Sequence, residues 1–102
     1  MAKPRKSNAG AQPLSFPNPS RSYDATTNGV RFWGYDGALE VSFFIEENAL
    51  AKISPRTKAN QGGLLNIFGA NRDRICTVAA NIYSRRRKAS HIFSYTLTDS
   101  DF

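Results

Sequence analysis

Histidine and cysteine are nearly absent from this chain of 102 residues, which contains one of each, His91 and Cys76. A structural zinc site uses about four such ligands, so the composition excludes one. A lone cysteine also excludes an internal disulfide and fits a reducing compartment. Catalysis by the Cys76 thiol would need His91 as its base. We instead expect Cys76 at the edge of the core and His91 in a surface loop.

Long apolar runs are absent as well, since no stretch reaches the roughly 18 to 20 residues that span a bilayer. The first residues are basic, and no apolar stretch follows them. We therefore expect no secretory signal peptide, no membrane association and a cytoplasmic location. Gly62-Gly63 lacks the lysine and the spacing of a phosphate-binding loop. Because the carboxylates form no convincing catalytic pair, the sequence predicts neither an enzyme nor a bound cofactor or metal.

Charge is distributed unevenly along the chain. Fourteen basic and eight acidic residues give a net charge of +6, which would attract nucleic acid, anionic lipid or an acidic protein. The basic residues cluster in the N-terminal segment and in the block Arg85-Arg86-Arg87-Lys88. Residues 1–13 carry no large apolar side chain after the first methionine, and we interpret them as a disordered basic tail. Residues 14–102 are predicted to form a single α+β domain.

Residues 30–45 contain the strongest local structural signal, two β-rich stretches that flank Asp36-Gly37. An Asp-Gly pair in this setting is typical of a two-residue hairpin turn. With these two residues at the centre of the turn, Phe32 would pair with Val41.

The alternation along this hairpin predicts two unlike faces. One face is apolar throughout and consists of Val30, Phe32, Leu39, Val41, Phe43 and Ile45. The other face is half aromatic, although a face exposed to water would be polar. It holds Trp33, Tyr35 and Phe44 together with Arg31, Glu40 and Ser42. We expect Leu14, Phe16 and Tyr23 of the N-terminal segment to cover these aromatic side chains. An uncovered face would instead suit a protein partner, a self-dimer or the stacking of single-stranded bases.

Two helices and two further strands complete the predicted layout. Acidic residues at 46–47 before a short apolar run predict a short helix that ends at Pro55. Apolar residues at helical spacing predict one long amphipathic helix over residues 64–88. We expect an edge strand near residues 14–16 and a closing strand over residues 92–98. The predicted fold class is α+β, with a small, mainly antiparallel sheet packed by one short and one long helix.

Several short motifs resemble a known family. They are Ser15-Phe16-Pro17-Asn18, Arg21-Ser22-Tyr23-Asp24, Val30-Arg31-Phe32-Trp33-Gly34, Ile67-Phe68, Asn71-Arg72-Asp73-Arg74-Ile75, Tyr95-Thr96-Leu97, Asp99 and Asp101-Phe102. These motifs are similar to those of a small bacterial family catalogued as domain-of-unknown-function family 1488. The resemblance covers residues 14–102 and implies a compact α+β domain, but it implies no activity. Gly69 departs from the pattern, because an acidic residue is expected there, and residues 89–94 look longer than the usual link.

The basic end of the long helix is the first candidate site. Arg74, Arg85 and Lys88 fall on one helical stripe, and Arg86 and Arg87 belong to the same basic block. Such a stripe could follow a phosphate backbone in a salt-dependent manner, or it could bind an acidic partner. The same cations would also oppose the helix dipole and keep the protein soluble.

Arg72 is a different case, because it falls within the apolar stripe of the helix. A charge there must reach water or meet a carboxylate. We expect a structural ion pair with Asp24 or Glu40. Removing one member of a buried pair costs several kcal/mol, so Arg72→Ala is predicted to unfold the protein.

Two hypotheses about function follow. The first is a non-catalytic interaction module that binds another protein through the face of Trp33, Tyr35 and Phe44 or through the helix end. The second is an accessory, sequence-nonspecific nucleic-acid-binding protein that uses the basic helix end and the N-terminal tail.

Overall fold

The computed structural model describes residues 14–17, 21–57, 60–86 and 94–102. Its elements are, in chain order, β1 (Arg21–Asp24), β2 (Gly29–Asp36), β3 (Leu39–Glu46), α2 (Glu47–Ile53), α3 (Gln61–Ala70), α4 (Arg72–Arg86), β4 (Ser94–Leu97) and the short 3-10 helix η1 (Asp99–Asp101). The strands form one sheet in the order β1-β2-β3-β4. Its first two pairings are antiparallel, and β4 runs parallel to β3. The predicted α+β fold with a mainly antiparallel sheet is confirmed. The predicted tail, Arg87, Lys88 and His91 lie outside the described residues.

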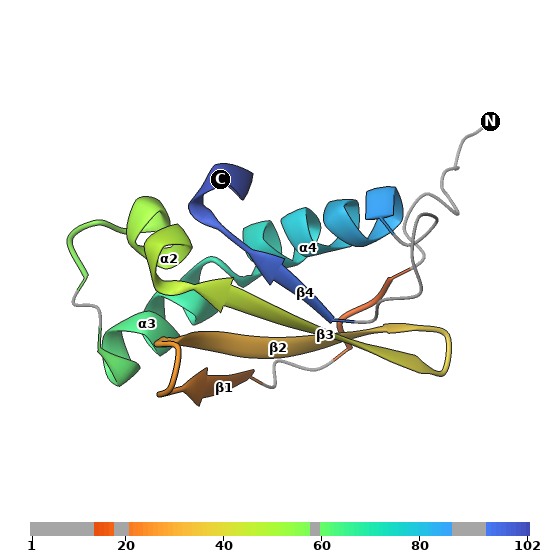
Figure 1. Ribbon diagram of the computed structural model, residues 1–102, viewed down its shortest axis with the longest axis horizontal. Helices are drawn as coiled ribbons and strands as arrows, with labels where there is room; N and C mark the ends of the chain where they lie inside the picture. The colour runs from red at the N-terminus through yellow and green to blue at the C-terminus, as the bar shows by residue number, and fades with distance from the viewer. Residues whose placement is uncertain (1–13, 18–20, 58–59, 87–93) are drawn as a thin grey trace.

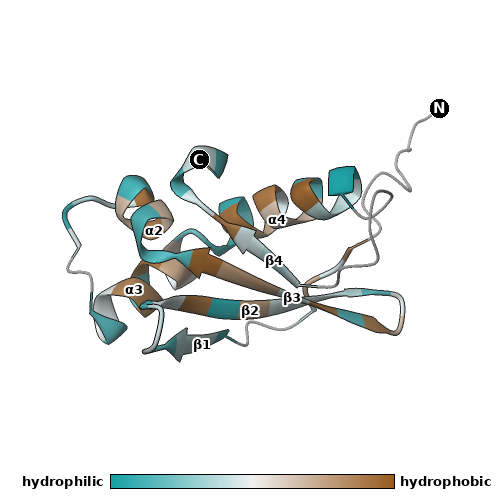
Figure 2. Cartoon of the chain, viewed as in Figure 1, coloured by the Kyte–Doolittle hydropathy of each residue, from teal (hydrophilic) through white to brown (hydrophobic). Residues whose placement is uncertain are grey.

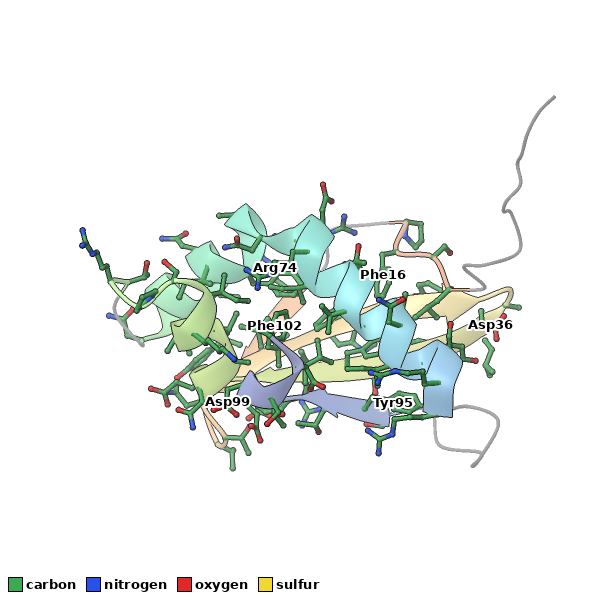
Figure 3. The ribbon with its side chains drawn as sticks, turned by 90° about the horizontal axis from the view of Figure 1, so that it is seen from above. Phe16, Asp36, Arg74, Tyr95, Asp99 and Phe102 are labelled. Carbon is green, nitrogen blue, oxygen red and sulfur yellow. The ribbon has the colours of Figure 1, made fainter. Side chains whose placement is uncertain are left out.

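The helices lie on one side of the sheet, which we call the covered face (Figures 1 and 3). Hydrophobic residues run along β2 and β3, whereas the last turn of α4 is hydrophilic (Figure 2). The strand residues that point to the helices are almost completely buried; they are Val30, Phe32, Val41, Phe43, Ile45, Tyr95 and Leu97. Leu64, Phe68, Ile75, Ala79 and Ile82 of α3 and α4 pack against them, as their helical spacing predicts.

Aromatic rings form the centre of this core. Phe32 stacks on Phe43 with ring centroids 5.2 Å apart and meets Phe68 of α3 at 4.9 Å. Phe43 in turn stacks on Tyr95 of β4, whose ring meets the edge of the Tyr83 ring of α4. The aromatic contacts therefore connect the hairpin, both long helices and the last strand.

The hairpin lies where the sequence predicts it, but its turn is one residue further along the chain. Gly37 and Ala38 are the central residues, and Phe32 pairs with Phe43 rather than with Val41. Gly37 has a φ of 64°, as the first central residue of a type II′ turn requires. The shift moves each partner by two positions, so the two faces keep their predicted residues. Leu39 differs, because its place at the hairpin end leaves it 44% exposed.

The single long helix predicted over residues 64–88 is wrong, because two helices meet at Asn71. The Asn71 backbone N–H donates to the carbonyl oxygens of Ile67 and Phe68 at the end of α3, and its side-chain amide also donates to Ile67. The Asn71 carbonyl then accepts from the Ile75 N–H in the first turn of α4. α3 also begins earlier than expected, because the Asn60 side chain accepts from the Gly63 N–H and caps the helix.

The N-terminal segment lies beside the outer half of β2. Ser15 and Tyr35 exchange two backbone hydrogen bonds of 2.8 Å, which form an isolated antiparallel bridge. The predicted edge strand near residues 14–16 is thus present as one bridge. Leu14 and Phe16 point to the covered face, where the Phe16 ring lies 6.0 Å from that of Phe32 and 5.8 Å from that of Phe43.

Candidate functional site

The second face of the sheet, which we call the open face, carries the three predicted aromatic residues. Register places Trp33 and Tyr35 of β2 on this face together with Phe44 of β3. No described helix lies on this side of the sheet (Figures 1 and 3). All three side chains are half-buried rather than exposed. The sequence-predicted candidate surface is therefore assembled as one continuous face.

The prediction that Leu14, Phe16 and Tyr23 cover this face is wrong. Leu14 is buried on the covered face, and Phe16 packs there against the core rings. Tyr23 pairs directly with Val30, and residues paired in this way point to the same side of a sheet. All three side chains therefore point to the covered face, away from Trp33.

Phe44 is fixed by close packing at one end of the open face. Its ring crosses directly over Gly29, where an added Cβ would lie 2.3 Å from the Phe44 Cζ and 2.5 Å from the Ile45 carbonyl oxygen. The Arg31 guanidinium lies 5.2 Å from the centre of the same ring. Arg31 also forms a 3.1 Å ion pair with Asp24 of β1. A cation is thus held on this face by an aromatic ring and a carboxylate together.

The carboxyl group of Asp24 is shaped by its turn as well as by Arg31. Its desolvation raises the pKa, but hydrogen bonds from the Thr27 and Thr26 backbone N–H groups and from Arg31 outweigh this effect. The pKa of Asp24 consequently lies below its usual value of 3.8. The carboxylate is therefore charged at neutral pH and compensates the charge of Arg31.

Tyr35 and Glu40 lie opposite each other at the other end of the open face. The Tyr35 hydroxyl donates to Glu40 Oε2 at 3.2 Å. This hydrogen bond and the charge of Glu40 raise the pKa of the Tyr35 phenol above its usual value of 10.0. Tyr35 is therefore neutral at physiological pH and holds the Glu40 carboxylate beside the aromatic residues.

The basic end of α4 does not form an uninterrupted cationic stripe in the described residues. The Arg74 guanidinium lies 5.6 Å from the centre of the Phe102 ring, and that of Arg86 lies 5.8 Å from the centre of Tyr95. Figure 3 shows Arg74 beside Phe102, with Asp99 on the neighbouring turn. The arginines therefore alternate with aromatic rings and with the carboxylates of η1.

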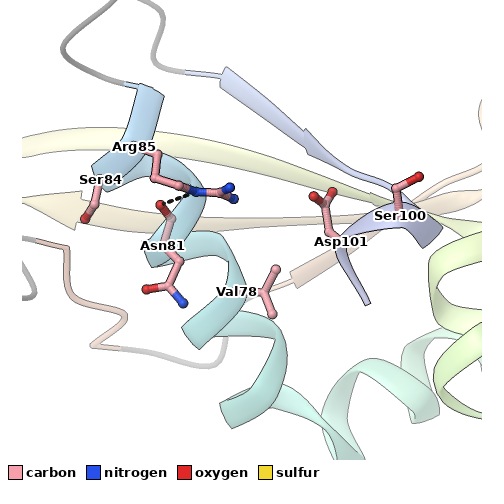
Figure 4. A pocket seen from close by; sticks show the side chains of 6 residues that line it. All are labelled: Val78, Asn81, Ser84, Arg85, Ser100 and Asp101. Atoms are coloured by element: carbon pink, nitrogen blue, oxygen red, sulfur yellow. Dashed lines mark hydrogen bonds between the residues drawn. The ribbon is translucent and has the colours of Figure 1, made fainter.

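Arg85 lines an open cleft between α4 and η1 with a volume of about 510 Å³. Figure 4 shows Arg85 and Asp101 on opposite sides of this cleft. The Arg85 Nε donates to the Asn81 carbonyl oxygen at 3.4 Å. The Asp101 carboxylate accepts instead from the Thr98 backbone N–H and closes a capping box. The cleft thus has charges of both signs on its walls.

Arg72 connects α4 to the N-terminal segment. Its Nη2 donates to the Phe16 carbonyl oxygen at 2.9 Å, and the side chain is half-buried. The two carboxylates that were expected as ion-pair partners, Asp24 and Glu40, belong to the open face, whereas α4 lies on the covered face. The contact described for Arg72 is therefore with a backbone carbonyl, because register directs both carboxylates away from the helix.

Cys76 lies half-buried on α4, as expected for a residue at the edge of the apolar stripe. Burial is the main cause that raises the pKa of its thiol above the usual value of 9.0. Among the described residues, no group of three or more histidine, cysteine, aspartate or glutamate side chains is placed to hold a metal ion.

Three charged residues around the aromatic side chains were not named as site residues from the sequence, although the predicted alternation already placed Arg31 and Glu40 on the same face. Arg31, Glu40 and Glu46 share the open face with Trp33 because of the observed register. The alternation along β2 and β3 contained this signal.

The comparisons with known proteins identify a family but no activity. Searches of curated proteins and of solved structures found no match. No helix in the described part of the chain has the length and apolar character needed to cross a membrane. Residues 14–93 match the family described as protein of unknown function (DUF1488), so the matched stretch ends before β4. Because this match covers most of the chain, the protein belongs to that family, as the motifs within residues 14–93 predicted; the motifs expected at residues 95–102 lie beyond the match.

Proposed function

We propose that this protein is a non-catalytic interaction module that binds another protein through the open face of its sheet. One observation carries the proposal: Trp33, Tyr35 and Phe44 share a sheet face on which no described element packs. Aromatic side chains are enriched at protein interfaces because they bury a large area at a small cost in conformational entropy. Here the paired strands hold all three rings in place before a partner arrives.

A peptide-selection experiment tests this function. A displayed library of random peptides is selected against the intact protein, and each selected peptide is then measured against variants. We expect Trp33→Ala to weaken binding by about tenfold or more, as for a central aromatic contact. Ser42→Arg should have a similar effect, because Ser42 pairs with Trp33 and a long side chain there would obstruct the face.

Leu39→Ala is the matched control for these variants. Leu39 is an exposed apolar residue of the same hairpin, but register directs it to the other face. Its removal should leave peptide binding unchanged. The function is refuted if no peptide is selected, or if the selected peptides bind the Ser42→Arg protein as well as the original, with folding of each variant checked by circular dichroism.

Nucleic-acid binding by the helix end is the second candidate function. Arg74, Arg85 and Arg86 are exposed on α4, which supports it. Asp101 lies across a cleft from Arg85, and Asp99 belongs to the same short helix η1. Both carboxylates oppose the approach of a phosphate backbone. A gel-shift titration with single- and double-stranded DNA at low and high salt tests this candidate, which fails if no shift occurs at low salt.

A further inference from the structure

We infer that the partner of the open face is a protein segment that carries lysine or arginine side chains. This inference rests on the proposed function and names the chemistry of its ligand. The charges among the aromatic residues and a cleft beside Phe44 carry it.

Among the residues that the structure describes, those of the open face carry an excess of negative charge. Asp24 and Arg31 compensate each other through their 3.1 Å ion pair. Glu40 and Glu46 point to the same face, and within the described part of the chain no cation forms an ion pair with either of them. The exposed arginines of α4 belong to the helix layer on the opposite side. The face is thus locally acidic although the whole chain carries +6.

A cleft of about 370 Å³ extends this acidic character at the end of β3. It is lined by Thr27, Phe44, Glu46, Glu47 and Asn48. One oxygen of Glu47 accepts from the Asn28 side-chain amide at 2.8 Å, which orients the carboxylate. The two carboxylates attract an ammonium or a guanidinium group, and Phe44 provides an apolar wall beside them.

Arg31 shows how this face binds a cation. It lies over the Phe44 ring and pairs with Asp24, so ring and carboxylate act together. A carboxylate also lies near Trp33. Tyr35 follows Trp33 on this face of β2, and Glu40 of β3 pairs with Tyr35. A cationic side chain of a partner could therefore meet aromatic rings and the Glu40 carboxylate at one end of the open face, and the carboxylates of Glu46 and Glu47 at the other.

The same charges argue against two other occupants. A second copy packed face to face would bring Glu40 and Glu46 of both chains together, and like charges in an interface are repulsive. A phosphate backbone would meet the same two carboxylates. A basic protein segment is the occupant whose charge complements the face.

Trp33 provides a direct readout, because it is the one tryptophan of the chain. The probe is a short synthetic peptide that alternates lysine with serine, titrated into the intact protein while Trp33 fluorescence is recorded. We expect saturable binding that weakens with added salt. Glu40→Gln and Glu46→Gln should each weaken it by about threefold, the size expected for loss of one exposed ion pair.

Asp99→Asn is the matched control, because it changes the net charge by the same amount at an exposed site in η1, outside the sheet. Binding of the lysine peptide should be unchanged in this variant. A matched peptide that alternates glutamate with serine, and a single-stranded oligothymidine, should leave Trp33 fluorescence unchanged.

Four outcomes overturn the inference. They are no binding of the lysine peptide, equal binding by the glutamate peptide, quenching of Trp33 by the oligothymidine, and an equal effect of all three charge variants. The proposed function is judged separately by the random library: peptides that need Trp33 but lack lysine and arginine would leave that function standing and remove this inference.

Discussion

The two faces of the sheet come from the same hairpin, yet they are built differently. On the covered face, Phe32 and Phe43 stack on each other and are almost completely buried under α3 and α4. On the open face, Trp33 and Phe44 are half-buried and lie among charged side chains. The covered face shows what this chain does with aromatic rings that stabilise the fold. The open face retains large rings without that burial, which is why we propose it as the binding surface.

Removal of one ring from each face is the strongest way to break this comparison. Phe32→Ala should lower the free energy of unfolding by about 3 to 5 kcal/mol, because it leaves a cavity among Phe16, Phe43 and Phe68. Trp33→Ala should cost about 1 to 2 kcal/mol, since its side chain is only partly buried. Urea denaturation measures both values. Equal costs would mean that the open face is part of the core.

A methyl group added on the open face tests the packing of Phe44. Gly29→Ala should destabilise the protein by about 1 to 3 kcal/mol, because the new Cβ would meet both the Phe44 ring and the Ile45 backbone. Gly62→Ala is the control, since the nearest atom to its new Cβ is 3.9 Å away. It lies in the first turn of α3 and should stabilise by up to about 1 kcal/mol. A neutral Gly29→Ala variant would contradict the close packing seen beneath Phe44.

Two tyrosine hydroxyls sharpen the comparison at the level of single hydrogen bonds. On the covered side, the Tyr83 hydroxyl donates to Asp36 Oδ2 at 2.7 Å, so Tyr83→Phe should cost about 1.5 to 3 kcal/mol. On the open face, Tyr35→Phe removes the exposed bond to Glu40 and should cost less than about 0.5 kcal/mol. Thermal denaturation of the Tyr83→Phe and Tyr35→Phe variants measures the two losses of stability. A larger cost for Tyr35→Phe would make the open face structural.

The smallest predicted effect is a change in the titration of Tyr35. Because Glu40 raises the pKa of the phenol above 10.0, the Glu40→Gln variant should titrate at lower pH than the original protein. The raised pKa favours the protonated phenol in the folded state. Its contribution to stability is therefore present below pH 10.0 and decreases as pH rises through the folded pKa. NMR of the Tyr35 ring measures the change, and an unchanged titration would contradict the contact.

The hairpin shows how far local sequence signals reach. Asp36-Gly37 located the turn, and the alternation gave the faces, because a shift of two positions leaves a face unchanged. The predicted register was wrong, because Asp36 belongs to β2 rather than to the centre of the turn. Its carboxylate accepts a hydrogen bond from Tyr83, which lies 47 positions further along the chain. A contact over this separation leaves no trace in the local pattern.

The predictions for the long helix and for the N-terminal segment were wrong for related reasons. The apolar spacing continues through residue 71, so periodicity alone could not show that Asn71 ends one helix and begins the next. The side of the sheet on which Leu14 and Phe16 lie depends on the single bridge between Ser15 and Tyr35. The aromatic residues of the open face were thus predictable as a set. That no described element covers them was not predictable.

The parallel pairing of β3 with β4 has a consequence for the order in which the chain folds. β1, β2 and β3 follow one another through short turns, so their contacts close small loops at a low cost in entropy. β4 pairs with β3 only after residues 47–93, which include three helices, have been brought back to the sheet. We expect β4 to join the sheet last, so that the hairpin with its open face is complete before the core is closed.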